Sequence, residues 1–505
     1  MTTTDTPLAP AAEAPTTGSP AAAATPPPSA PEPAGSYPVL RWLVLATFTV
    51  ILNETVMVNA IPRLMVEFDV GARAAQWLST AFMLTMAVVI PVTGWFLQRV
   101  TTRTAFTVAM SVFGAGTLLC ALAPTFPVLV GGRVVQATGT AVMMPLLMTT
   151  LMTVVHERDR GRVMGNVTLA ISVAPALGPA LSGVVLAAAG WRWLFGLVLP
   201  VVVLVTLLGL RRLEDVGETR PGGVDWASVV LSALGFGGLV YGLSRIGEEH
   251  PGAVPALGWV LGGVGVVAAF VLRQHRLTRT SGPLLDLRAL THRTFTVSLA
   301  MQSLAFLTML GAMILLPLYL QNLRGLSPLQ TGLLVAPGGL AMGLLGPVVG
   351  RVFDRVGARP LVVPGALGVL ASLAILSRID AVTPYGLLLG VQVLLMVSLA
   401  ALFTPAFTLG LGALPPHLYP HGSSLLGTVQ QVAAAVGTAL TVTVLSWRSA
   451  QLAAGGAGEA AAYVGGVRAA FTVAAVLAVG VVVLAAMLPN RLPVTDGSGP
   501  APAAH

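Results

Sequence analysis

The chain has 505 residues, of which 55% are hydrophobic and only 9% are charged. Soluble domains carry about 25% charged residues, so this composition excludes a soluble globular protein and indicates an all-α, polytopic membrane protein. The formal net charge of +8 comes from arginine, because the chain has no lysine. Membrane proteins hold such cations in cytoplasmic loops, and the sequence has no basic tract with interleaved aromatic residues. We therefore expect a lipid bilayer, and no nucleic acid, as partner.

Residues 1–36 are rich in Pro, Ala and Thr and hold almost no large apolar side chain. Such a composition cannot bury a core, so we expect a disordered cytoplasmic tail. The segment has no basic region followed by an apolar one, which excludes a signal peptide. We expect residues 490–505 to form a second disordered cytoplasmic tail.

A spanning helix needs about 20 mostly apolar residues, and the sequence contains fourteen such runs. They lie near residues 39–61, 77–98, 104–122, 127–152, 161–189, 193–210, 225–245, 255–273, 294–320, 328–353, 359–378, 384–410, 421–447 and 467–488. We group them into an N-terminal six-helix bundle (37–212), two extra helices with a cytoplasmic linker (213–285) and a C-terminal six-helix bundle (286–489). An even number of crossings returns the C-terminus to the side of the N-terminus.

Arginines are unevenly distributed between the two sets of loops. The loops on the side of the N-terminus hold roughly twice as many arginines as the loops on the other side, and cytoplasmic loops carry such an excess. We therefore predict a multi-pass protein of the plasma (inner) membrane with both termini in the cytoplasm.

Two stretches of the sequence repeat each other. PVTGWFLQRVTTR, from Pro91, aligns without gaps with PVVGRVFDRVGAR, from Pro347. Each stretch ends the second span of a six-helix set and enters the third. Repeated halves with a binding site at their interface are typical of transporters.

Glu54 is the one carboxylate that we place well inside a span. A charged side chain at the bilayer centre costs roughly 2.5–3.5 kcal/mol on insertion scales, whereas a neutral, protonated acid tolerates a low dielectric far better. A site that takes up a proton on one side and releases it on the other needs such an acid. The alternative is a structural glutamate that is hydrogen-bonded to Asn53, Asn59 or Gln136.

Other chemistry is not indicated by the sequence. All seven histidines fall in loops or tails by this placement, which argues against a metal site or a histidine relay within the membrane. The chain lacks a Gly-x-x-x-x-Gly-Lys-Ser/Thr loop for ATP, and its single cysteine excludes an intrachain disulfide. We expect no metal and no cofactor, with the proton as the coupling ion.

The stretch GRVFDRVGAR, residues 350–359, closely resembles the cytoplasmic loop signature of the major facilitator superfamily, and specifically of its fourteen-helix drug:proton antiporters. The resemblance covers nearly all of residues 37–488. It implies a cytoplasmic gating motif made of Gly350, Asp354, Arg355, Gly357 and Arg359.

Within this motif we expect Asp354 to pair with Arg355 and Arg359, beside the positive N-terminal end of the next helix. Such a cluster can hold the cytoplasmic ends together in one transport state and release them in the other. The first copy of the repeat departs from the pattern, because Gln98 stands where the acid is expected.

The stretch APALGPALSG, residues 174–183, resembles the antiporter signature of the exporting branches. This resemblance implies that Pro175, Gly178, Pro179 and Gly183 shape a bent, tightly packed helix that seals a central cavity against leak. We expect both glycines to leave room for a neighbouring backbone and both prolines to remove a backbone hydrogen bond. Packing alone, without a sealing role, is the alternative.

Two further matches concern the polar groups within the spans. GRVVQATGTAVMMP, residues 132–145, fits the family's Arg-x-x-Gln pattern at Arg133 and Gln136 and implies a role for Arg133 in proton transfer. An arginine inside a span needs an acceptor or a wet cavity, unless its side chain reaches the nearer interface. LNET, residues 52–55, resembles the lincomycin-resistance-type branch, with Asn53 in the position where many relatives keep an acid. We predict Asn53, Asn59 and Gln136 as a polar cavity.

These features predict a proton-coupled multidrug efflux transporter and not an enzyme. It would export small, largely apolar compounds across the plasma membrane by alternating access, and we expect a monomer. The first alternative is a dedicated exporter of one endogenous metabolite or lipid. A membrane-embedded enzyme is a remote alternative. Such enzymes need paired acids, a metal cluster or a Ser/His arrangement, and we place only one acid and no histidine well inside a span.

Overall fold

The computed structural model describes residues 1–2, 37–216, 222–246, 255–278 and 282–492. The side chains of residues 58, 59, 72, 73, 176, 179, 180 and 328 also lie outside the description. The compact unit begins at Tyr37. The predicted tails, 1–36 and 490–505, fall almost wholly outside the described residues, so their predicted disorder stays a prediction.

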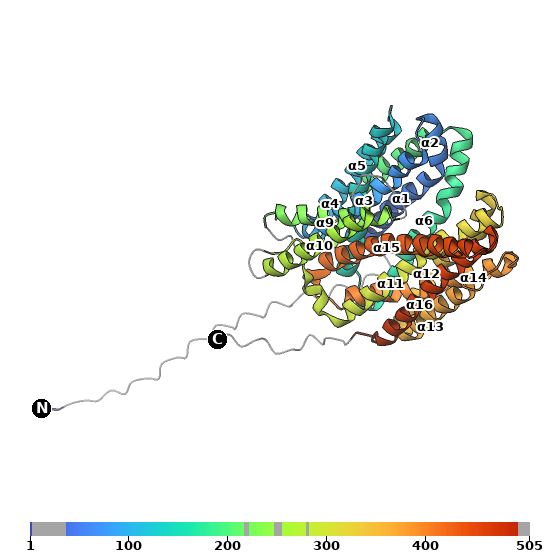
Figure 1. The fold of residues 1–505 in the computed structure, drawn as a ribbon. Coiled ribbons are helices and arrows are strands. Elements are labelled where there is room, and N and C mark those ends of the chain that lie inside the picture. The colour runs from blue at the N-terminus through green and yellow to red at the C-terminus, as the bar shows by residue number, and fades with distance from the viewer. Residues whose placement is uncertain (3–36, 217–221, 247–254, 279–281, 493–505) are drawn as a thin grey trace. The chain divides into compact units, whose positions relative to one another are not determined.

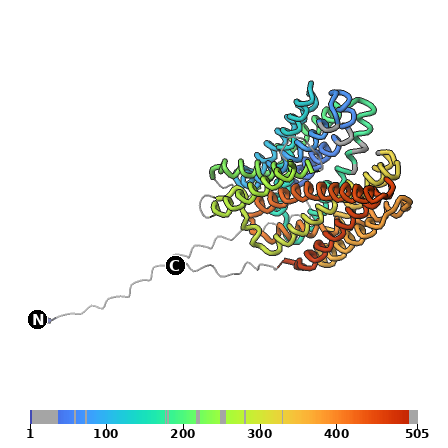
Figure 2. The backbone as a smooth tube through the Cα atoms, viewed as in Figure 1, coloured from blue at the N-terminus to red at the C-terminus, as the bar shows by residue number. Residues whose placement is uncertain are grey.

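The described chain is helical throughout, as Figure 1 and Figure 2 show, and its elements follow one another without a strand in these residues. The first part contains α1 (Pro38–Val56), η1 (Met57–Ala60), α2 (Ile61–Glu67), α3 (Ala72–Leu97), α4 (Thr102–Ala121), α5 (Phe126–Val154), η2 (Glu157–Asp159), α6 (Arg160–Ala188), α7 (Arg192–Gly196) and α8 (Val198–Arg212). Next come α9 (Trp226–Ser244), α10 (Ala256–Leu277) and η3 (Leu287–Thr291). The last part contains α11 (Arg293–Leu318), η4 (Tyr319–Leu323), α12 (Pro328–Val356), α13 (Arg359–Leu376), α14 (Tyr385–Gly412), η5 (Pro416–Leu418), α15 (Tyr419–Ala454) and α16 (Glu459–Met487).

The predicted all-α membrane fold is confirmed. Within the described residues, 13 helices are long and apolar enough to cross a membrane. The remaining predicted span corresponds to α6, which has 29 residues and packs against α1, α12 and α14. The count of fourteen crossings is therefore approximate, but every predicted span coincides with a helix.

The two six-helix sets meet through two equivalent pairs of helices. The first set is α1, α3, α4, α5, α6 and α8, and the second is α11 to α16. Across their interface α6 packs against α12, and α3 packs against α15. Because α3 and α12 hold the two copies of the sequence repeat, and α6 and α15 are both fifth in their sets, the two contacts are related by the repeat.

The two extra helices lie outside both sets. α9 packs along α3 and α15, and α10 packs on α9, as Figure 1 shows in green. Close contact at Gly235, Gly242 and Gly263 joins α9 to α10, and a short ion pair of 2.7 Å joins Asp225 to Arg273 at one end of the pair. The pair therefore covers the outside of the α3–α15 contact.

We call one end of the helix array the arginine-rich end. It is the end at which α3, α5, α8, α10, α12 and α14 finish, and the short connection between α12 and α13 turns there. Gly357 has φ +88°, in the left-handed region that glycine tolerates best. A Cβ atom at this position would also lie 2.6 Å from the carbonyl oxygen of Asn490, so the turn is closed by the segment that follows α16.

We predict that Gly357→Ala destabilises the protein by about 1–3 kcal/mol, because it puts a side chain on a left-handed residue and against Asn490. Thermal unfolding of the purified protein in detergent measures this loss. Gly386→Ala is the matched control, since no described atom lies within 4 Å of a Cβ placed there. Equal melting temperatures for the two variants would contradict the prediction.

Candidate functional site

Glu54 lies about half-way along the continuous helical segment formed by α1, η1 and α2. Pro62 has no N–H to offer the carbonyl four residues earlier, and the backbone just after Glu54 takes the tighter 3₁₀ form. The carboxylate is partly buried. It makes no hydrogen bond in the described part of the chain, but it lies within reach of the charge of Arg133.

Arg133 is held deep within the first helix set and does not extend to the membrane interface, since it is only 2% exposed. Its guanidinium donates to Oε1 of Gln136 at 2.7 Å and to the carbonyl of Leu78 at 3.3 Å. It also lies over the ring of Phe82, with 4.0 Å between Cζ and the ring centroid. Gln136 in turn donates to the hydroxyl of Thr117 at 2.8 Å. A chain of hydrogen bonds thus fixes the one cation that faces Glu54.

The predicted polar cavity is only partly assembled. Gln136 is fully buried and serves Arg133 and Thr117 rather than Glu54. Asn53 is 2% exposed, and its Oδ1 has no hydrogen-bond partner among the described residues. The side chain of Asn59 lies outside the described residues. The alternative of a glutamate hydrogen-bonded to Asn53 or Gln136 is therefore not what the structure shows.

The antiporter stretch brings α6 against the residue next to Glu54. α6 runs without interruption from Arg160 to Ala188, so Pro175 and Pro179 lie inside one helix, although the side chain of Pro179 is not described. A Cβ atom on Gly178 would overlap the hydroxyl of Thr55 and lie 2.8 Å from its Cβ. The expected close packing is present at Gly178.

Gly183 does not match the expectation. A Cβ atom there would meet no described atom within 4 Å, so the prediction of a close backbone contact at this glycine is wrong. It lies more than one turn beyond Gly178 on the same helix.

The predicted gating motif has a different set of partners from those expected. Asp354 does not pair with Arg355 or Arg359. Its carboxylate accepts from the backbone N–H groups of Gly161 at 2.9 Å and Arg162 at 2.7 Å. These groups lie in the first turn of α6, where N–H groups are free and the helix dipole favours a negative charge. Asp354 thus caps a helix of the other half.

The two arginines of the motif bind the segment that follows α16. Arg359 donates through Nε to the carbonyl of Leu488 at 3.0 Å and through its backbone N–H to Asn490 at 3.1 Å. Arg491 donates to the carbonyl of Arg355. The expected Asp354–arginine cluster is therefore replaced by two separate contacts, one between the halves and one within the second half.

Gln98 stands in the first copy of the repeat where the second copy has Asp354, and it makes a different contact. Gln98 donates to the carbonyl of His417 at 2.8 Å, just before α15. Pro420 occupies the first turn of α15 and has no N–H, so a carboxylate at position 98 would find fewer donors than Asp354 finds on α6. This difference accounts for an amide where the second copy has an acid.

Four glycines let α6 and α12 touch backbone to backbone. A Cβ on Gly165 would lie 2.8 Å from the carbonyl carbon of Gly346, and one on Gly350 would lie 2.7 Å from the carbonyl carbon of Gly161. Such distances are too short for any side chain. Gly161 and Gly165 form one Gly-x-x-x-Gly pattern, and Gly346 and Gly350 form another, which is the spacing that allows close helix contact in membranes.

The hydrogen bonds between the two helix sets, as far as the residues are described, gather towards the arginine-rich end. Besides those of Asp354 and Gln98, they are Arg160 to Tyr419, Thr149 to Ser423, Ser423 to Pro145, Thr168 to Thr404 and Ser424 to Ile90. The structure therefore shows the arginine-rich end closed.

Residues that the sequence analysis missed also belong to this end. His421 was placed with the other histidines in loops or tails, but it is 3% exposed in the first turn of α15. Gly161 and Tyr419 were likewise not singled out. The Gly-x-x-x-Gly spacing was a readable signal for Gly161, whereas nothing local marks Tyr419.

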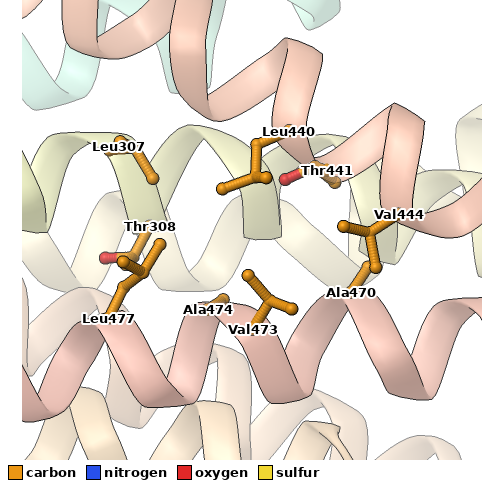
Figure 3. A pocket seen from close by; sticks show the side chains of 9 residues that line it. All are labelled: Leu307, Thr308, Leu440, Thr441, Val444, Ala470, Val473, Ala474 and Leu477. Carbon is orange, nitrogen blue, oxygen red and sulfur yellow. The ribbon is translucent and has the colours of Figure 1, made fainter.

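A small cavity lies between α11, α15 and α16 (Figure 3). Its volume is about 10 Å³, and the hydroxyls of Thr308 and Thr441 are the polar groups among its lining residues. A single water molecule needs about that much room. This cavity is not a site for an organic substrate.

Comparison with known proteins identifies the family. The sequence model of the Major Facilitator Superfamily matches residues 43–438. The chain belongs to the major facilitator superfamily. As a member, it is a multi-pass membrane transporter of small molecules and not an enzyme, and the predicted family is confirmed.

Relatives of this transporter cover most of its length. An uncharacterized MFS-type transporter, YcnB, of Bacillus subtilis is 39% identical over 437 residues, which are 86% of this chain and 91% of that protein. The lincomycin resistance protein LmrB of Listeria monocytogenes is 37% identical over 409 residues, covering 81% and 86%. A multidrug resistance protein B homolog of Mycobacterium tuberculosis is 29% identical over 422 residues, covering 80% and 75%.

Solved structures share the fold of this transporter. The human organic anion transporter MFSD10 (TETRAN) matches with a TM-score of 0.64 at 14% identity, over 89% of this chain and 99% of that one. The proton:xylose symporter XylE matches with a TM-score of 0.59 at 15% identity, over 88% and 95%. At such identities the likeness concerns the fold alone.

We predict that Gly178→Leu reduces transport to near background while the protein still reaches the membrane, because the new side chain must displace Thr55 beside Glu54. Gly183→Leu is the matched control and should transport normally, because its side chain enters open space. Substrate accumulation in cells, with membrane expression measured alongside, compares the two. Normal transport by Gly178→Leu would show that the α6–α1 contact is not required.

Proposed function

We propose that this transporter exports small, largely apolar compounds from the cytoplasm in exchange for protons. The observation that carries the proposal is Glu54, an acid half-way along a membrane helix that has no hydrogen-bond partner among the described residues and faces one buried cation. Ionisable groups within membrane spans are functional by default. The relatives named for lincomycin resistance and multidrug resistance support a drug-like substrate.

Glu54 can exist in two states at this position. As an anion it is attracted by Arg133, whose charge is fixed by Gln136 and Leu78. As a neutral acid it no longer needs that cation and tolerates the low dielectric. A proton taken up from outside and released to the cytoplasm would switch the site between these states once in each cycle.

The proton gradient supplies the energy. One charge that crosses 100 mV is worth about 2.3 kcal/mol, and any pH gradient adds to this value. Tenfold accumulation against a gradient costs about 1.4 kcal/mol. One proton per substrate is therefore sufficient for export of a neutral compound.

In this proposal the contacts at the arginine-rich end form a gate. In the closed state Asp354 caps α6 and the four glycines bring α6 onto α12. Opening this end breaks both contacts together, because they lie on the same pair of helices. Rocking of the two helix sets about a central site would thus expose the substrate to one side at a time.

We place the arginine-rich end in the cytoplasm, with the protein a monomer in the plasma membrane and both termini inside. Single cysteines at position 276, on the exposed end of α10, and at position 457, between α15 and α16, test the orientation in a Cys120→Ser background. An impermeant thiol reagent added to intact cells should label position 457 and not position 276. Labelling of position 276 from outside would overturn the placement.

The decisive test of proton coupling is Glu54→Gln, which keeps the volume of the side chain but cannot carry the proton. We expect substrate binding close to that of the parent protein and uphill export reduced to background, whereas Glu54→Asp keeps partial activity. Export is measured as substrate accumulation in energised cells, with and without an uncoupler. Proton release from purified protein on addition of substrate should also disappear.

Glu67→Gln is the control for this experiment, because Glu67 lies at the surface and pairs with Arg192 at 3.2 Å. It should export normally. Parental export by Glu54→Gln would place the coupling elsewhere. A panel of dyes and antibiotics then separates polyspecific export from a dedicated exporter of one endogenous metabolite or lipid.

A further inference from the structure

His421 lies on the second contact between the helix sets, between α15 and α3. It is 3% exposed, and its Nδ1 is buried without a hydrogen-bond partner in the described part of the chain. The ring fills the space above Gly94 of α3, since a Cβ atom on Gly94 would lie 2.9 Å from Nδ1 and 3.2 Å from the Cα of His421. The imidazole is thus part of the closed interface itself.

The charges around this ring are mostly positive. Arg99 approaches from the turn after α3, Asp286 from just before η3, Arg288 from η3 and His417 from η5. α11 contributes only an apolar ring near this turn, and α5 contributes a neutral hydroxyl to the neighbouring Ser423. Asp286 is therefore the one anion in the group.

Asp286 is already committed to another partner. Arg288 donates to it from its backbone N–H at 2.9 Å, from Nε at 3.0 Å and from a terminal nitrogen at 2.6 Å. Burial opposes ionisation of Asp286, but these bonds from Arg288 outweigh it and hold the pKa of the carboxyl below its usual range. The side chain of Arg99, in contrast, donates only to carbonyl groups, those of Gly222 and Trp95.

A neutral imidazole therefore fits this interface and an imidazolium does not. A buried cation without a hydrogen-bonded partner is costly. Asp286 attracts a charged ring here, but burial opposes it, and Arg99, Arg288 and His417 all repel it. When α15 and α3 separate, the ring meets water and can be charged without this cost. Because histidine is the side chain that titrates near neutral pH, the exposed ring gains its proton within the physiological pH range.

We propose that His421 makes the arginine-rich end pH-sensitive: the neutral ring permits closure of α15 on α3, and a proton on the ring favours the open end. The sign follows from linkage, because the open state binds the proton more tightly and acid shifts the equilibrium towards it. A low pH on the side of the membrane that this end faces thus favours the state that is open to that side. The inference concerns the conformational equilibrium and does not require proton coupling at Glu54.

The test is a distance measurement across the arginine-rich end. Spin labels on Arg211→Cys of α8 and Arg351→Cys of α12, both exposed, in a Cys120→Ser background, report opening in purified protein in lipid nanodiscs. When the pH falls from about 8.5 to about 5.5, we expect the ratio of long to short distances to rise. The rise is up to about tenfold for each pH unit below the pH at which the exposed ring titrates. His421→Gln should reduce this response and leave only the part that comes from Glu54.

Two further variants make the outcome decisive. His275→Gln, at an exposed histidine of α10, should keep the parental response. Arg288→Gln removes a cation and frees Asp286, so the closed interface should tolerate a charged ring better and the acid-driven opening should become smaller. This variant also tests the proposal if His421→Gln fails to fold, because an undiminished response would contradict it.

Glu54→Gln separates this inference from the proposed function. The pH response should persist in Glu54→Gln, because His421 is intact. A response that survives His421→Gln but disappears in Glu54→Gln would assign it to the coupling acid. That result would overturn the role of His421 and leave the proposed export mechanism standing.

Discussion

The contact of α6 with α12 is the constraint on which the closed state depends. A membrane gives no hydrophobic driving force between helices, so association relies on close packing and hydrogen bonds. Gly161 and Gly165 face Gly346 and Gly350 with no side chain between the two backbones. Only at this separation can the short side chain of Asp354 reach the N–H groups at the start of α6. The glycines and the carboxylate are therefore both required for this contact, since neither closes the interface without the other.

The two contacts between the halves are related by the sequence repeat but differ in chemistry. On α6 the free N–H groups receive a carboxylate, which is an interaction of an anion with a helix N-terminus. On α15 Pro420 removes a donor from the same turn, and the contact relies on the amide of Gln98 and the neutral ring of His421 instead. The repeat thus supplies two related contacts between the halves, and the contact between α3 and α15 contains a histidine.

Hydropathy was sufficient to predict the helices, and the repeated stretch and the short motifs were sufficient to predict the family. These signals are local, because a span is a property of about 20 neighbouring residues. The partner of Asp354 could not be predicted in this way, because Gly161 lies far along the chain and its N–H groups are available only at a helix start. His421 was misplaced for a related reason: a hydropathy profile locates the end of a span but not the face that meets another helix. Gly178 and Gly183 look alike in sequence, and only the packing of Thr55 against Gly178 distinguishes them.

In the proposed cycle, α6 links Glu54 to the arginine-rich end. Gly178 of α6 touches Thr55, the residue after Glu54, and the first turn of the same helix is capped by Asp354. Sixteen residues of continuous helix separate these points, about 24 Å at the usual rise per residue. A helix transmits a tilt over that length with little loss, whereas a loop would absorb it. In the proposed cycle, therefore, a change in the charge of Glu54 needs to displace only its α6 neighbour by a small amount for the cap at Asp354 to weaken. The proton site and the gate can then be far apart and still act together.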